Sequence, residues 1–385
     1  MRPTFHKAGW VFVKPGAWIE NGIVEVAGGR IISVRKCRTG GDLIDHGPGV
    51  IMPALINAHT HLSLSALRAR VEIGKGFVEW VKDLISARSV LSAEDVAESA
   101  ARGAQEAKDS GTGFLAEVGS VEPGATAMKA NGLEGIVFSE VLGNSLETLA
   151  LRDDDNGLSF SFAGHGLHTT SPDLLRAVCS RALRGNRVFS MHLAESEAET
   201  EFLATGRGLW ADLLNFRGID FGNWGIGGER PVQRALRFGL LGPRTVAVHL
   251  LEVSKAEISI LADTGTAICL CPRSNFLLHG RLPNIGGFIA AGLNPALGTD
   301  SLASTPSLSL FDEMAFVSAE YPELPPDDLL AFSTINAAKA IGRSELGTVE
   351  PGQRARLIYV DIAAHSEKAA ALELVACQPA RIEWL

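Results

Sequence analysis

Two histidines stand one residue apart just after an apolar run in the first sixth of the chain. The segment NAHTHLSLS places His59 and His61 directly behind GVIMPALI. Residues two apart in a β-strand point to the same face, so these two imidazoles could bind one cation at the end of a strand. Either histidine alone is more readily explained as an ordinary core or rim residue. The choice depends on what the rest of the chain supplies.

Further imidazole and carboxylate side chains follow apolar runs later in the chain. His192 ends the run in FSMHLAES, and Glu195 follows it by three residues. His249 ends VAVHLL, and Asp300 ends ALGTDS. Side chains that follow such runs are expected to be partly buried, and a buried charge needs a partner or a metal ion. Several separate segments with this feature make coincidence a poor explanation.

One set of these side chains suits a single divalent metal ion. The set is three imidazoles and one carboxylate, namely His59, His61, His192 and Asp300. Such ligands fit Zn²⁺ or Fe²⁺ with a position left for water, whose pKa the ion lowers from about 15.7 to about 7. We predict that Asp300 accepts the proton of this water and that Glu195 protonates the leaving side of the substrate. His249 would hydrogen-bond the attacking water or the developing oxyanion, so the pattern predicts metal-assisted hydrolysis.

Eight short apolar runs in the middle of the chain must position these residues. They are ALINAHTH, TGFLAEVGS, GIVFSEVLG, FSFAGHGLHT, RVFSMHLAES, TVAVHLLEV, TAICLCP and NPALGTDS. Helix-like segments separate many of them, and repeated strand–helix units over about 250 residues predict a (β/α)₈ TIM barrel. Such a barrel carries its chemistry at the C-terminal ends of its strands. A doubly wound open sheet is the alternative, but no GxGxxG turn follows an early strand.

The two ends of the chain differ from this middle part. Residues 1–54 and 345–385 contain short alternating segments such as GWVFV, AWIENG, GIVEVAGGRIISVRK and RARLIYVDI, separated by Gly and Asn-Gly turns. We therefore predict an α/β protein in which a small β-sandwich domain, built from both chain ends, flanks a barrel at residues 55–344.

Composition and charge argue against two classes of partner, nucleic acids and membranes. The formal net charge of −9 and the pI near 5.6 argue against nucleic acid as a partner. No apolar stretch approaches 18 residues and no leader-like segment opens the chain, so we expect no membrane partner and a cytoplasmic location. Cys269 and Cys271 could form half of a metal site, but a buried Cys more commonly acts as a small apolar residue. A small molecule is therefore the expected substrate.

The HxH pair, with HLAESEAE, VAVHLLEV and LGTDSLAS, resembles the amidohydrolase superfamily over nearly the whole chain. The HxxE pattern from His192 to Glu195 is similar to its deaminase branch, which acts on amino-substituted nitrogen heterocycles. The resemblance implies the four ligands named above, one Zn²⁺ or Fe²⁺ per chain, Glu195 as proton shuttle and His249 as the residue that orients water. It also allows a homodimer, a common assembly in this branch.

Other matches concern the substrate. GHGLHTTSPDLL is similar to a deaminase segment that implies substrate contact by His165, while His168 replaces an aromatic residue and its role stays open. CPRSNFLLHGRLPN resembles the pocket-lining segment after the seventh strand. There Arg273 departs from the pattern and either binds a substrate carboxylate or forms a structural ion pair.

The stretch from NAHTHLSLS to FVEWV also resembles the aminodeoxyfutalosine deaminase group, although Ser63 replaces its usual Glu. The substrate of that group is a 6-aminopurine nucleoside that bears a benzoate and belongs to menaquinone synthesis. The benzoate would give Arg273 or Arg68 a carboxylate partner. Trp80, in the same stretch, either closes over the substrate or packs in the core.

The leading prediction is thus a metal-dependent deaminase that releases ammonia from a 6-aminopurine nucleoside such as aminodeoxyfutalosine. Deamination of S-adenosylhomocysteine or methylthioadenosine, and hydrolysis of a cyclic amide or imidazolone, are alternatives on the same scaffold. A non-catalytic scaffold is a third alternative, which the intact ligand set disfavours. Residues 208–231 contain Trp210, Phe216, Phe221 and Trp224 among glycines and are either a mobile lid or a dimer contact.

Overall fold

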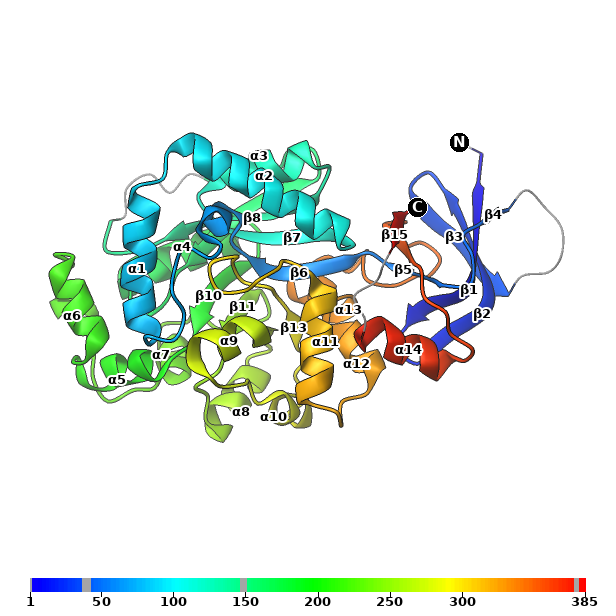
Figure 1. Ribbon diagram of the computed structural model, residues 1–385. Helices are drawn as coiled ribbons and strands as arrows, with labels where there is room; N and C mark the ends of the chain where they lie inside the picture. Colours follow the sequence, from blue (N-terminus) through cyan, green and yellow to red (C-terminus); the bar gives the residue numbers. More distant parts are fainter. Residues whose placement is uncertain (1, 37–42, 146–150, 377–380) are drawn as a thin grey trace.

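The computed structural model describes residues 2–36, 43–145, 151–376 and 381–385. Figure 1 shows a helix-covered barrel and, beyond one end of it, a small sheet that contains strands from both ends of the chain. The strand β5 (Val50–Pro53) of the small sheet leads almost directly into the first barrel strand, β6 (Leu55–Thr60). This direct connection ties the two parts together.

The barrel is an eight-stranded parallel sheet. Its strands, in spatial order, are β6, β7 (Thr112–Gly119), β8 (Glu134–Val141), β9 (Leu158–Gly164), β10 (Phe189–Leu193), β11 (Thr245–His249), β12 (Ala267–Leu270) and β13 (Ala296–Leu297). A parallel bridge between Thr60 and Asp300 joins the first strand to the segment after the last and closes the circle. Each predicted apolar run overlaps one of these strands, so the predicted (β/α)₈ barrel is confirmed.

Helices surround the barrel, most of them against its outer face (Figure 1). They are α1 (Phe77–Ser89), α2 (Ala93–Asp109), α3 (Val121–Ala130), α4 (Pro172–Arg184), α5 (Glu197–Thr205), α6 (Leu209–Phe216), α7 (Pro231–Arg237), α8 (Lys255–Asp263), α9 (Pro272–His279), α10 (Ile285–Ala290), α11 (Leu310–Glu320), α12 (Pro326–Phe332), α13 (Ile335–Ala340) and α14 (Glu367–Ala376), with the short 3₁₀ helices η1 (Leu62–Leu67) and η2 (Gly222–Trp224). Several begin at a serine whose hydroxyl accepts a backbone N–H, as Ser92 and Ser254 do in full capping boxes. These caps fix where the two helices start.

The small sheet is mixed and has seven strands. They are β1 (Thr4–Lys14), β2 (Ala17–Ala27), β3 (Arg30–Lys36), β4 (Ile44–Asp45), β5, β14 (Leu357–Val360) and β15 (Ile382–Trp384). The predicted turn at Asn21-Gly22 is wrong, because β2 runs straight through it. Asn21 takes a φ of 49° inside the strand, and the hairpin turns lie on either side, at Pro15–Gly16 and Gly28–Gly29. Asn tolerates this left-handed conformation better than other non-glycine residues.

The barrel strands are buried on both faces, as expected for a parallel sheet covered by helices. Cys269 and Cys271 are free and fully buried in an apolar cluster inside the barrel, which supports their interpretation as small apolar residues. Among the residues that the structure describes, no helix combines the length and the apolarity needed to cross a membrane.

Candidate metal and active site

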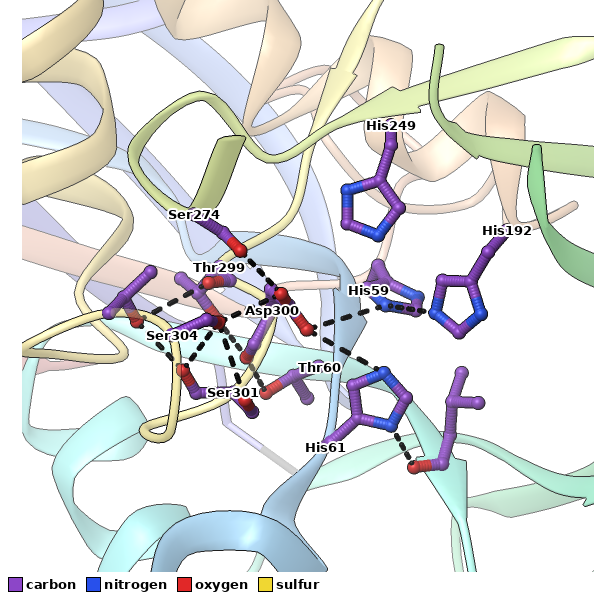
Figure 2. Close-up of polar contacts among 12 residues, drawn as sticks. His59, Thr60, His61, His192, His249, Ser274, Thr299, Asp300, Ser301 and Ser304 are labelled. Atoms are coloured by element: carbon purple, nitrogen blue, oxygen red, sulfur yellow. Dashed lines mark hydrogen bonds and ion pairs between the residues drawn. The ribbon is translucent and has the colours of Figure 1, made fainter. Parts of the chain in front are cut away.

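The side chains singled out in the sequence meet at the C-terminal ends of the barrel strands. His59 lies in β6 and His61 follows it, His192 lies in β10, His249 ends β11, and Asp300 stands three residues after β13. All five are buried, with 1% to 7% of each residue exposed. Figure 2 shows the four imidazoles grouped on one side of the Asp300 carboxylate.

Hydrogen bonds to the backbone orient two of the imidazoles. Nδ1 of His61 lies 2.8 Å from the carbonyl oxygen of Val118, and Nδ1 of His192 lies 2.8 Å from that of His165. A carbonyl only accepts, so both rings carry their proton on Nδ1 and leave Nε2 with a free lone pair. Burial also lowers the pKa of His192 well below its usual value, which keeps the ring neutral.

The free nitrogens converge on one point. Nε2 of His59 lies 3.2 Å from Nε2 of His192, and ligand atoms of His59, His61 and His192 all lie within 4.8 Å of one another. Oδ1 of Asp300 is 3.6 Å from Nε2 of His61 and 3.9 Å from Nε2 of His59. Ligands of a tetrahedral ion at about 2.1 Å lie roughly 3.4 Å apart. The donor set therefore fits one divalent metal ion.

Two serines hold the Asp300 carboxylate in place. Oδ2 accepts hydrogen bonds from Ser274 Oγ at 2.5 Å and Ser304 Oγ at 2.8 Å, which leaves Oδ1 facing the imidazoles (Figure 2). The backbone carbonyl of Asp300 accepts a hydrogen bond from Thr60 Oγ1 at 3.0 Å. Both serines were missed in the sequence, because nothing in their spacing ties them to Asp300.

The backbone at this rim is held in unusual conformations. His249, Asp300 and Ala194, which lies between His192 and Glu195, have φ values of 76°, 59° and 54°. A positive φ in a residue other than glycine costs about 1–3 kcal/mol and persists only where the surroundings enforce it. Here it turns the chain sharply at the strand ends and directs the side chains into the barrel mouth.

Glu195 lies between two imidazoles. Its Oε1 is 3.8 Å from Nε2 of His249 and 3.6 Å from Nε2 of His279 in α9. Burial by itself would raise the pKa of Glu195, but His249 and His279 outweigh it and bring the pKa to about 2. The backbone N–H of Glu195 also donates to Glu199 Oε2 at 2.8 Å. Glu195 is thus an ionised carboxylate that two imidazoles and the Glu199 carboxylate hold in a fixed position.

A cavity of about 330 Å³ opens beside these residues. Its inner end is polar and contains His61, His192, Glu195, His249 and Asp300. Its outer wall is apolar and comes mainly from two helices, with Phe77, Trp80, Val81, Leu84 and Ile85 from α1 and Trp210, Leu213 and Leu214 from α6. The cavity can therefore hold a polar reacting group at one end and an apolar group at the other.

Of the five residues predicted to bind substrate, the structure brings two into this cavity, His165 and Trp80. The side chain of His168 is fully buried, packs on Trp210 with ring centres 4.3 Å apart, and lies 3.6 Å from Glu199. It does not line the cavity.

The two predicted arginines also lie outside the cavity. Arg273 points from α9 toward α11, where its guanidinium lies 3.7 Å from both Asp312 and Glu313. Arg68 forms an ion pair with Glu106 of α2 on the surface. Both guanidinium groups already have carboxylate partners within the chain, so neither is placed to bind a substrate carboxylate.

Two ionisable residues of the cavity were missed in the sequence, Glu140 and Arg217. Glu140 stands near the end of β8, with its Oε1 3.7 Å from Nδ1 of His192 and without a hydrogen-bond partner among the described residues. Burial raises its pKa. The sequence did contain a signal for Glu140, because GIVFSEVLG places this acid after an apolar run, as in the other strands that end at the barrel mouth. Arg217 follows α6, and no pattern in the sequence connects it to the barrel mouth.

The segment 208–231 is anchored by two of its four aromatic residues. Trp210 and Trp224 are buried, and Trp224 Nε1 donates to Asn144 Oδ1 at 2.9 Å. Phe216 lies at the other extreme, with 86% of the residue exposed. Its α6 forms part of the cavity wall.

Comparisons with known proteins agree with this geometry. The model of the amidohydrolase family matches residues 50–380. The 5-methylthioadenosine/S-adenosylhomocysteine deaminase of Symbiobacterium thermophilum is 30% identical over 374 residues, which cover 89% of this chain and 81% of that protein.

Two solved structures share the fold. The aminofutalosine deaminase of Helicobacter pylori, in complex with methylthio-coformycin, has a TM-score of 0.84 at 24% identity, over 99% of this chain and 97% of that one. An adenosine deaminase of Xanthomonas campestris with bound zinc has a TM-score of 0.82 at 23% identity, over 99% of this chain and 91% of that one.

Proposed function

The chain belongs to the amidohydrolase family, and from this premise we propose that it is a metal-dependent deaminase of adenosine-type nucleosides altered at the 5′ position. As a member it is a hydrolase that acts on carbon–nitrogen bonds. The observation that carries the proposal is Glu195, a buried carboxylate that lies between two imidazoles and faces the same cavity as the convergent ligand set. The relative from Symbiobacterium thermophilum, named for two 5′-thio derivatives of adenosine, supports the substrate class.

The metal would be held by the convergent set His59, His61, His192 and Asp300. We propose Zn²⁺ or Fe²⁺, since imidazole nitrogen suits both. When bound, such an ion supplies Lewis acidity and makes water a stronger nucleophile at neutral pH.

The chain's own residues would handle the protons. Glu195 would accept one proton of the attacking water and deliver it to a ring nitrogen of the purine, and the second proton of that water would go to the departing amine. Asp300, with Oδ2 held by two serines, presents Oδ1 as the base that moves a proton toward the departing amine. His249 orients the attacking water through Nε2, and the apolar outer wall keeps bulk water away from the reaction.

Within this class we propose aminodeoxyfutalosine, the benzoate-bearing nucleoside of menaquinone synthesis, as the preferred substrate. Its support is the resemblance of the first barrel segment, together with an outer cavity wall suited to an aromatic arm. Methylthioadenosine and S-adenosylhomocysteine are the competing substrates.

Ammonia release tests the proposal. We would offer the metal-loaded protein aminodeoxyfutalosine, methylthioadenosine, S-adenosylhomocysteine, adenosine and the cyclic amide hydantoin in parallel. We expect ammonia from the 5′-altered nucleosides and least from hydantoin, which opens without losing ammonia. Opening of hydantoin with no ammonia from any nucleoside would replace deamination by cyclic-amide hydrolysis.

A further inference from the structure

One buried imidazole, that of His168, has no task in the chemistry above. His168 lies in the loop that follows β9, and its side chain has no exposed surface. Neither of its ring nitrogens has a hydrogen-bond partner among the described residues. A buried polar group without a partner is costly, so an imidazole at this position requires an explanation.

The His168 ring faces Glu199 in the first turn of α5. Nδ1 of His168 lies 3.6 Å from Oε1 of Glu199, and both side chains are fully buried. Oε1 of Glu199 also lacks a hydrogen-bond partner within the described ranges. The separation is longer than a hydrogen bond but too short for a bridging water, so the two groups are direct neighbours.

The other carboxylate oxygen of Glu199 holds the backbone of Glu195. Oε2 accepts the N–H of Glu195 at 2.8 Å, while the N–H of Glu199 donates to Ser196 Oγ at 3.1 Å. The two bonds tie the residue before the helix to its first turn, much as a capping box does. Ala194, with its φ of 54°, needs such restraints to keep its conformation.

His168 also supports the wall of the cavity. Its ring packs on Trp210 with ring centres 4.3 Å apart, and Trp210 lines the cavity. A Cβ atom on Gly166 would come within 2.8 Å of Cε1 of His168, so the absence of a side chain there makes room for the ring. One side chain therefore contacts both the support of Glu195 and the support of the wall.

We propose that His168 is a positioning residue that acts through Glu199 to keep Glu195 in place for proton transfer. His168 directs an N–H from Nδ1 toward Oε1 of Glu199 and thereby fixes the carboxylate that holds the Glu195 backbone. The part in proton transfer rests on the proposed function, whereas the chain of contacts does not. Because His168 lies outside the cavity, its loss should change kcat rather than KM.

Two substitutions separate this role from simple packing. His168→Leu keeps most of the volume beside Trp210 but removes the donor. His168→Asn keeps an N–H near the position of Nδ1 but leaves space beside Trp210. We expect His168→Leu to lower kcat about 10- to 100-fold with KM nearly unchanged, the scale for misplacing a reacting group by about 1 Å.

The second substitution should give the opposite pattern. We expect His168→Asn to recover most of kcat and to raise KM, because Trp210 loses the ring that supports it. His365→Leu, at an exposed histidine before α14, is the control for the substitution itself. A kcat near that of the wild type in His168→Leu, or an equal loss of kcat in both variants, would overturn the proposal.

A variant at the other end of the contact covers the case in which His168→Leu does not fold. Glu199→Met keeps the length of the side chain but removes the acceptor of the Glu195 N–H. We expect the same fall in kcat at a nearly constant KM. An unchanged kcat in Glu199→Met would show that Glu195 keeps its position without this support.

Hydrogen exchange separates failure of this inference from failure of the proposed function. Exchange of the Glu195 amide, followed by mass spectrometry of a peptide that spans residues 192–199, needs no substrate. In His168→Leu we expect it to be about tenfold faster than in the wild type and His168→Asn, with peptides of α11 unchanged. This result without any deamination would retain the contacts and reject the function, whereas equal exchange in all three proteins would overturn the inference in an active deaminase.

Discussion

The two ends of the cavity are built differently. At the inner rim the ionisable side chains come from strand ends, are nearly fully buried, and are held by backbone carbonyls and serine hydroxyls. At the outer wall, α1 and α6 present apolar side chains, and neighbouring Leu142 and Phe216 are 53% and 86% exposed. The difference indicates that the strands fix the reaction, whereas the covering helices determine which molecule undergoes it.

The largest effect should come from the inner rim. Glu195→Gln keeps the shape of the side chain but removes its ability to carry a proton. We expect kcat to fall about 10³-fold, the usual scale for one acid–base group, while bound metal stays near one ion per chain. Rate measurements with metal analysis would check both points, and full activity in this variant would remove Glu195 as the proton shuttle.

A smaller effect, a loss of metal affinity, is expected when Asp300 loses one of the hydroxyl groups that hold its carboxylate. Ser304→Ala removes one of the two hydroxyls that hold Asp300 Oδ2. We expect metal affinity to fall about 10- to 100-fold, the scale observed when partners of ligands are removed. Competition with a chelator would measure it. Ser259→Ala, an exposed serine of α8, is the matched control, and the same affinity in both variants would contradict the supporting role of Ser304.

A substitution in the outer wall should change KM and leave kcat nearly unchanged. Leu84→Ala removes part of a half-buried side chain of α1 that lines the cavity. Loss of about 1 kcal/mol of apolar contact corresponds to a rise in KM of roughly fivefold, with kcat nearly unchanged. Steady-state kinetics beside Leu372→Ala, an exposed leucine of α14, would show it. A fall in kcat at constant KM would break the proposed division between rim and wall.

The smallest effect on activity is expected from a change of Glu313, which lies in α11 behind the cavity. Burial raises the pKa of Glu313 to about 8, against the opposing charge of Arg273. At pH values between 4.5, the ordinary pKa of this side chain, and about 8, Glu313 has lost its proton in the unfolded chain but keeps it in the folded chain. The stability contributed by Glu313 is therefore present at pH 4.5 and is lost as the pH rises to about 8.

Glu313→Gln should remove this pH dependence. Relative to the wild type, its free energy of unfolding should rise by roughly 1–3 kcal/mol between pH 5 and pH 8. Urea unfolding at several pH values would measure the difference, with Glu320→Gln, exposed at the end of the same helix, as the control. A difference that stays constant with pH would show that Glu313 is ionised in the folded chain.

The inner rim could be predicted from the sequence because each of its residues follows an apolar run. A parallel barrel brings such positions together whatever the loops do, which placed His59, His192 and Asp300 correctly at the barrel mouth. Glu140 carried the same signal and was missed. The turn predicted at Asn21 failed because an Asn-Gly pair fits a strand with one left-handed residue as well as it fits a hairpin.

The outer wall could not be predicted in the same way. Arg273 stands at the start of α9, just after β12, whereas Arg217 directly follows α6, and the sequence favoured Arg273 as the arginine of the cavity. The choice depends on how α9 and α6 are rotated against their neighbours, and α9 turns Arg273 toward the carboxylates of α11. Helical periodicity gives the faces of a helix but not the direction in which each face points.

The most direct test of the central claim is product analysis after reaction in ¹⁸O-labelled water. The metal-loaded protein would be incubated with aminodeoxyfutalosine and, separately, with methylthioadenosine, and ammonia would be measured beside mass spectra of the products. We expect one ¹⁸O atom at purine carbon 6 for every ammonia released. Products without label at that carbon, or no ammonia from either nucleoside, would contradict hydrolytic deamination at this site.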